Sequence, residues 1–123
     1  MLTAAFVILG LALSLGAVLA VLHLRAAGTG AVPMPLAALH GLFALAGFGC
    51  LLLALRGPPR GLETGTASFG AIAATLIALA ALAGGGIFVA LRFKPRLAGA
   101  LIGVHATLAV SGVVILAAYL LAG

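Results

Sequence analysis

Two stretches decide the fold: "LAALHGLFALAGFGCLLLAL" (36–55) and "LIGVHATLAVSGVVILAAYL" (101–120). They align without a gap, and each is long and apolar enough to cross a membrane as one helix. The alignment puts His40 and His105 at the same depth of the two segments. Ionisable side chains are costly inside a membrane, so an intramembrane histidine indicates a functional site, and two at equivalent positions indicate it more strongly.

Composition places the whole chain in the membrane class. Hydrophobic residues make up 66% of the 123 residues, charged residues 6%, and the mean hydropathy is +1.46. A water-soluble domain of this length could not cover itself with so little polar surface. Four apolar segments, roughly 2–24, 36–55, 66–91 and 97–121, predict one all-α domain (1–123), a four-helix up-down transmembrane bundle. The first segment lacks a basic start and a clear cleavage site, so we expect it to be a helix of the mature protein.

Basic residues predict the orientation in the membrane. The end with fewer basic residues has Arg56 and Arg60, close to the single acidic residue, Glu63. The richer end has Arg25, Arg92, Lys94 and Arg96. The positive-inside rule puts the richer end in the cytoplasm and both termini outside. We expect a bacterial inner-membrane protein whose positive charge meets lipid headgroups and not nucleic acid.

The repeat extends to the preceding helices. "LHLR" (22–25) and "VALR" (89–92) end the first and third segments with the same arginine. A duplicated helix pair, 1–56 and 66–123, accounts for both matches and relates the second and fourth helices by a pseudo-two-fold axis. In a ring visited in chain order these two helices are diagonal, so His40 and His105 can face each other across the centre.

A strip of small side chains follows each histidine on its helical face. Four and seven residues on come Ala44 and Gly47 after His40, and Ala109 and Gly112 after His105. Such a strip suits a planar macrocycle. Gly16 and the run 84–86 lie near the same depth and leave further room.

These features predict a single haem b ligated by His40 and His105, because haem iron readily takes two axial imidazoles. Arg25, Arg92 and Arg96 would pair with the haem propionates at the membrane surface. The chain resembles the b-type membrane cytochromes, in which diagonal helices of a four-helix bundle supply paired histidines. The resemblance implies an electron carrier or redox subunit with a quinone or redox-protein partner. Those carriers commonly hold a second haem, whereas the far-end positions are apolar, so we expect one haem near one face.

Other interpretations stay open. Each histidine could simply hydrogen-bond a neighbouring helix, and His23 with His40, His105 and Met34 could form a transition-metal site. Pigment or lipid could fill the groove instead. The alternative function is an accessory subunit of a larger complex or a homo-oligomer, packed through the face of Gly99 and Gly103, which points away from His105.

Enzymatic chemistry is not expected. The spans contain no carboxylate, and Glu63 lies in a loop, which argues against proton-coupled antiport and hydrolysis. Cys50 has no second cysteine to pair with and is expected to pack as a small hydrophobic side chain.

Overall fold

The computed structural model of the chain describes residues 1–25 and 33–122, apart from the side chains of residues 95 and 96. Its four helices are α1 (Leu2–Arg25), α2 (Met34–Ala54), α3 (Phe69–Phe93) and α4 (Pro95–Leu121). All four are long and apolar enough to cross a membrane. The prediction of four apolar helices is confirmed.

Two helix boundaries differ from the sequence-based prediction for local reasons. The third helix was expected from residue 66, but it begins at Phe69 because Thr66 closes a turn. The Thr66 amide donates to the carbonyl oxygen of Gly61 at 2.9 Å, and Gly61 has a φ of +70°, which glycine adopts readily.

The predicted connector between the last two helices is almost absent. Only Lys94 separates α3 from α4. Pro95 starts α4, a position where the missing amide hydrogen of proline costs no hydrogen bond and its fixed φ suits the helix.

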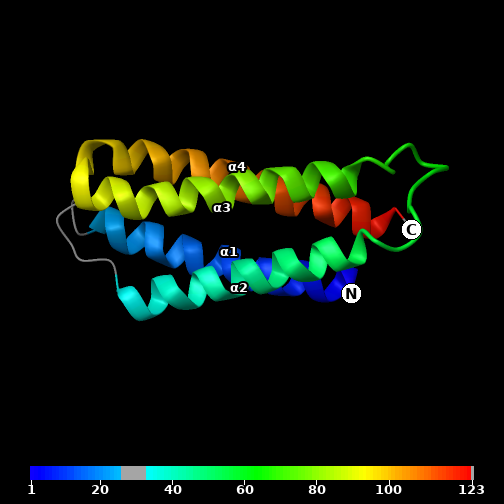
Figure 1. Ribbon diagram of the computed structural model, residues 1–123, viewed down its shortest axis with the longest axis horizontal. Helices are drawn as coiled ribbons and strands as arrows, with labels where there is room; N and C mark the ends of the chain where they lie inside the picture. Colours follow the sequence, from blue (N-terminus) through cyan, green and yellow to red (C-terminus); the bar gives the residue numbers. More distant parts are fainter. Residues whose placement is uncertain (26–32, 123) are drawn as a thin grey trace.

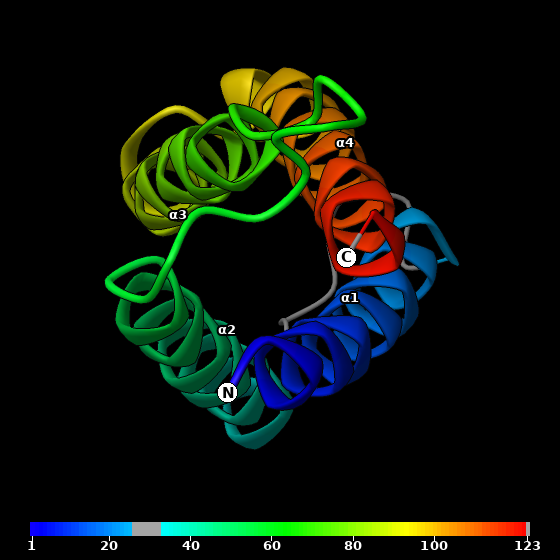
Figure 2. The same cartoon turned by 90° about the vertical axis from the view of Figure 1, so that its right-hand side faces the viewer.

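The helices pack as two pairs. The first pair is α1 with α2 and the second pair is α3 with α4, and contacts inside each pair are far more extensive than the α1–α4 and α2–α3 contacts between pairs. Figure 1 shows the pairs as two layers along the long axis, and the end view in Figure 2 shows the helices in chain order around a ring. The histidine-bearing helices, α2 and α4, therefore lie on a diagonal.

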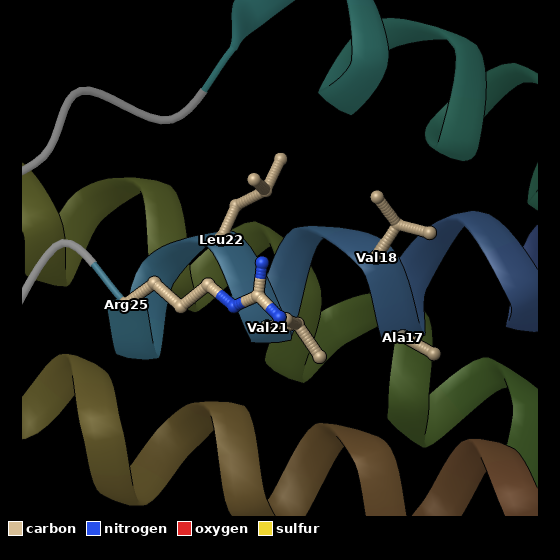
Figure 3. A pocket seen from close by; sticks show the side chains of 5 residues that line it. All are labelled: Ala17, Val18, Val21, Leu22 and Arg25. Carbon is tan, nitrogen blue, oxygen red and sulfur yellow. The ribbon is translucent and has the colours of Figure 1, made fainter.

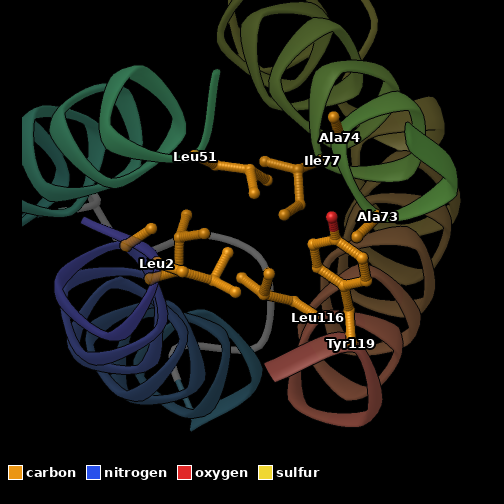
Figure 4. Close-up of a cluster of buried hydrophobic side chains, with 9 residues drawn as sticks. Leu2, Leu51, Ala73, Ala74, Ile77, Leu116 and Tyr119 are labelled. Carbon is orange, nitrogen blue, oxygen red and sulfur yellow. The ribbon is translucent and has the colours of Figure 1, made fainter. Parts of the chain in front are cut away.

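The buried core cluster that joins the two pairs lies at one end of the bundle. Figure 1 shows both chain termini at that end, which we call the terminal end, and the short connection between α3 and α4 at the opposite, basic end. The core cluster takes residues from the starts of α1 and α3 and from the last turns of α2 and α4 (Figure 4). Its members include Leu2, Leu51, Ile77, Leu116 and Tyr119, with Leu51 and Leu116 fully buried.

Small residues bring the backbones together within each pair. Ala5 and Ala12 are buried on α1, and Ala73 and Ala80 are buried on α3. Such residues allow close helix packing in an apolar environment, where dispersion contacts do most of the stabilising.

Candidate functional site: a pair of histidines across the bundle

His40 of α2 and His105 of α4 meet across the ring of helices. Their ring centroids lie 5.9 Å apart, and the ring planes are inclined by 75°. Both side chains are half-buried. The structure therefore brings the two residues of the predicted site together from opposite corners of the bundle.

Each imidazole is fixed by a backbone carbonyl of its partner helix. His40 Nδ1 lies 2.8 Å from the carbonyl oxygen of Ala12, and His105 Nδ1 lies 2.7 Å from that of Ala80. A carbonyl oxygen only accepts, so Nδ1 is the donor in both bonds. In the neutral ring the proton then sits on Nδ1, and Nε2 keeps its lone pair.

A glycine on the same partner helix makes room for each ring. A Cβ atom at Gly16 would lie 2.9 Å from Cε1 of His40, and one at Gly84 would lie 3.2 Å from Cε1 of His105. Each glycine comes four residues after the alanine whose carbonyl accepts the hydrogen bond. Both pairs thus hold their histidine in the same way.

The strip beyond each histidine is used for helix packing. A Cβ at Gly47 would lie 2.7 Å from Cγ of Leu9, and one at Gly112 would lie 2.8 Å from Cγ1 of Ile77. These glycines, predicted to face a macrocycle, therefore lie against α1 and α3. Ala44 and Ala109, one turn closer to the histidines, are half-buried.

Two of the arginines predicted to meet propionates, Arg25 and Arg92, lie at or near the ends of α1 and α3. Arg25 and Arg92 are both exposed. Arg25 is nine residues from Gly16, which is half a rotation of an ideal helix and so the opposite face of α1. The side chain of Arg96 lies outside the described residues.

His23 lies on the inner face of α1, two turns from Gly16 towards the basic end. Its Nδ1 is buried and has no hydrogen-bond partner within residues 1–25 and 33–122. It does not join the other histidines: the described part of the chain holds no group of three or more His, Cys, Asp or Glu side chains that could bind a metal ion. The interpretation of His23, His40 and His105, with Met34, as one metal site is therefore wrong.

The sequence reasoning missed the two carbonyl acceptors. Ala12 and Ala80 lie in "ALSLG" (12–16) and "AALAG" (80–84), each an alanine followed four residues later by the glycine that clears space for the ring. That shared spacing is a second repeat, displaced by one residue from the arginine match, and it was available in the sequence.

On α4, Gly99 and Gly103 are exposed, and no atom would lie within 4 Å of a Cβ at either position. Cys50 is half-buried and packs against the core cluster as a free thiol. Comparison of the chain with protein-family models, with curated proteins and with solved structures gives no match.

Proposed function

We propose that the chain crosses the membrane with its helices in alternating directions and holds one haem b between His40 and His105, as a one-electron carrier or redox subunit. The observation that carries this proposal is the spacing of the two imidazoles. Two imidazoles that bind one metal ion at about 2 Å each have ring centroids about 6 Å apart. The observed separation is 5.9 Å.

The hydrogen bonds of the two rings also favour ligation. Metal-binding histidines usually donate their other ring N–H to a carbonyl or carboxylate, which fixes the tautomer and the ring orientation. His40 and His105 each do so through Nδ1, to the carbonyls of Ala12 and Ala80. Within the described residues, neither Nε2 has a hydrogen-bond partner.

The donor set suits haem iron better than a small metal ion. A structural or catalytic zinc site uses three or four protein ligands, whereas haem iron needs only the two axial ligands. Room for the ring would lie between the two helix pairs, which contact each other much less than the helices within a pair do. The core cluster that joins the pairs occupies the terminal end and leaves the histidine level free of it.

A haem held in this way would cycle between ferric and ferrous states, taking one electron from a donor and passing it to an acceptor. The site is nearer to the basic end of the bundle, since His40 lies six residues from the first residue of α2. With one such site the chain would exchange electrons at one membrane face, with a quinone or a redox protein. Positive charge at that face, from Arg25, Arg92 and Lys94, would favour an acidic partner surface.

The test is to compare full-length protein with the variants His40→Ala, His105→Ala and His23→Ala in detergent. Absorption spectra are recorded after air oxidation and after dithionite reduction, and haem is counted as the pyridine haemochrome. We expect about one haem per chain and a sharp reduced α-band in the wild type, as for bis-imidazole ligation. The band should be lost in His40→Ala and His105→Ala and retained in His23→Ala.

A wild-type protein that binds no haem under reconstitution would overturn the proposal. So would an unchanged low-spin spectrum in both His40→Ala and His105→Ala. His23→Ala is the matched control. It also removes a histidine from the bundle, but His23 contacts neither ring of the pair.

A second candidate function is that of an accessory subunit that packs against another membrane protein or a second copy. The exposed face of Gly99 and Gly103 favours it, since small residues let helices approach closely in a bilayer. Both functions can coexist, because this face of α4 is turned away from His105.

A further inference from the structure

Two apolar grooves lie on the outside of the bundle at the basic end. The first, of about 310 Å³, is lined by Ala17, Val18, Val21, Leu22 and Arg25 of α1 (Figure 3). The second, of about 390 Å³, lies between α3 and α4, and its lining includes Gly86, Val89, Leu101 and Lys94. Both are separate from the histidine pair, because their lining residues on α1 and α3 do not include the residues that contact the imidazoles.

Part of the lining of the two grooves falls at corresponding positions of α1 and α3. The spacing that relates Gly16 to Gly84 also relates Val18 to Gly86, Val21 to Val89 and Leu22 to Ala90. The first groove is lined by α1 alone, whereas Leu97 and Leu101 of α4 also line the second.

Each groove combines an apolar floor with a single cationic end. Arg25 is the last residue of α1, and Lys94 is the one residue between α3 and α4, so both cations lie at the membrane-surface end of their groove. Figure 3 shows the Arg25 side chain extending from the end of α1 back towards Val21 and Val18. An apolar channel that ends in a cation matches an acyl chain attached to a phosphate.

We propose that each groove binds one acyl chain of an anionic phospholipid, with the lipid phosphate on Arg25 in the first groove and on Lys94 in the second. The proposal is independent of haem binding. It assigns a phosphate partner to the exposed Arg25, and it predicts two lipid sites per chain at the basic end.

The test is a lipid titration of the full-length protein in detergent, followed by native mass spectrometry. Phosphatidylglycerol and phosphatidylcholine with identical acyl chains are compared. Three kinds of variant separate the effect of charge from the effect of groove shape. Arg25→Gln and Lys94→Gln each remove one cation, and Ala17→Leu with Gly86→Leu fills both grooves while keeping every charge. Arg56→Gln is the control, because it removes an exposed cation at the terminal end.

The groove-filling variant is compatible with the fold. Ala17 is exposed, and a Cβ at Gly86 would meet only Cδ1 of Leu101, at 3.9 Å. Unchanged helical circular dichroism confirms that each variant is folded before its lipid binding is read.

We expect up to two tightly bound phosphatidylglycerol molecules per wild-type chain and weaker binding of phosphatidylcholine. Arg25→Gln and Lys94→Gln should each weaken one site about fivefold, the effect of one basic residue near an anionic lipid surface. Ala17→Leu with Gly86→Leu should abolish the preference, and Arg56→Gln should leave it unchanged. Equal binding of the two lipids to the wild type, full binding by the groove-filled variant, or an equal loss in Arg56→Gln would overturn the proposal.

Discussion

The two helix pairs repeat one set of contacts and differ in what lies beside them. In both pairs a histidine donates to an alanine carbonyl, a glycine four residues on clears space for the ring, and a second glycine receives an aliphatic side chain. The pairs differ at the basic end, where α1 carries His23 and the second pair turns at Lys94 alone. The repeated contacts surround the histidines, whereas the differences lie nearer to the basic end.

The largest expected effect is at the glycines that receive aliphatic side chains. Gly47→Ala would put a Cβ 2.7 Å from Cγ of Leu9 and 3.1 Å from its backbone nitrogen, and Gly112→Ala would put one 2.8 Å from Cγ1 of Ile77. Each substitution should lower the free energy of unfolding by about 1–3 kcal/mol, as overpacking does. Gly47→Ala should cost more, because its Cβ comes closer to backbone, which cannot move like a side chain: 3.1 Å at Gly47 against 3.4 Å at Gly112.

Thermal unfolding of the two variants in the same detergent measures this difference. Gly10→Ala and Gly85→Ala are the controls, since no atom lies within 4 Å of a Cβ at either position. The loss in Leu9→Ala combined with Gly47→Ala should be smaller than the sum of the two single losses, and additivity of these two changes would argue against the contact.

A smaller effect is expected at the glycines beside the imidazoles. A Cβ at Gly16 would lie 2.9 Å from Cε1 of His40, while one at Gly84 would lie 3.2 Å from Cε1 of His105. Because the end of a side chain can shift, the stability loss should be about 1 kcal/mol or less. The displaced ring should be a poorer ligand, so Gly16→Ala should retain less haem than Gly84→Ala, counted as pyridine haemochrome. The reverse order would contradict the closer approach of Gly16 to its imidazole ring.

The smallest effect on the fold is expected at the exposed glycines of α4. The alignment matches Gly103 with Ala38 of α2, which is also exposed. Gly99→Val with Gly103→Val should change the free energy of unfolding by less than about 0.5 kcal/mol, as surface substitutions usually do. Crosslinking in detergent should then show less self-association than in the wild type, with Ala38→Val as the control. If the Gly99→Val with Gly103→Val variant self-associates as much as the wild type, the face of Gly99 and Gly103 is not the interface.

Hydropathy and helical periodicity predict much of this arrangement, for physical reasons. Runs of apolar residues fix the four helices, and the gapless match of the two histidine segments predicts their diagonal placement. Periodicity also tells that Gly47 shares a face with His40. It does not tell which neighbouring helix that face meets, so the contact of Gly47 with Leu9 was not foreseen.

The carbonyl acceptors and the arginines show the same limit. A backbone carbonyl has no residue-specific signature, so Ala12 and Ala80 could be found only through the glycine that follows each of them. The prediction that Arg25 and Arg92 serve the histidine site rests on their depth alone. Both are exposed, and Arg25 lies on the face of α1 opposite to Gly16. Depth and helical face taken together place His23, and not Arg25, on the inner side of α1.

Chemical rescue with free imidazole tests whether each helix pair contributes one imidazole ligand to the haem. Glycine in place of His40 or His105 leaves space that free imidazole can enter. We expect His40→Gly and His105→Gly both to lose the low-spin absorption spectrum and added imidazole to restore it in both. A low-spin spectrum that persists in both variants without imidazole would contradict this expectation.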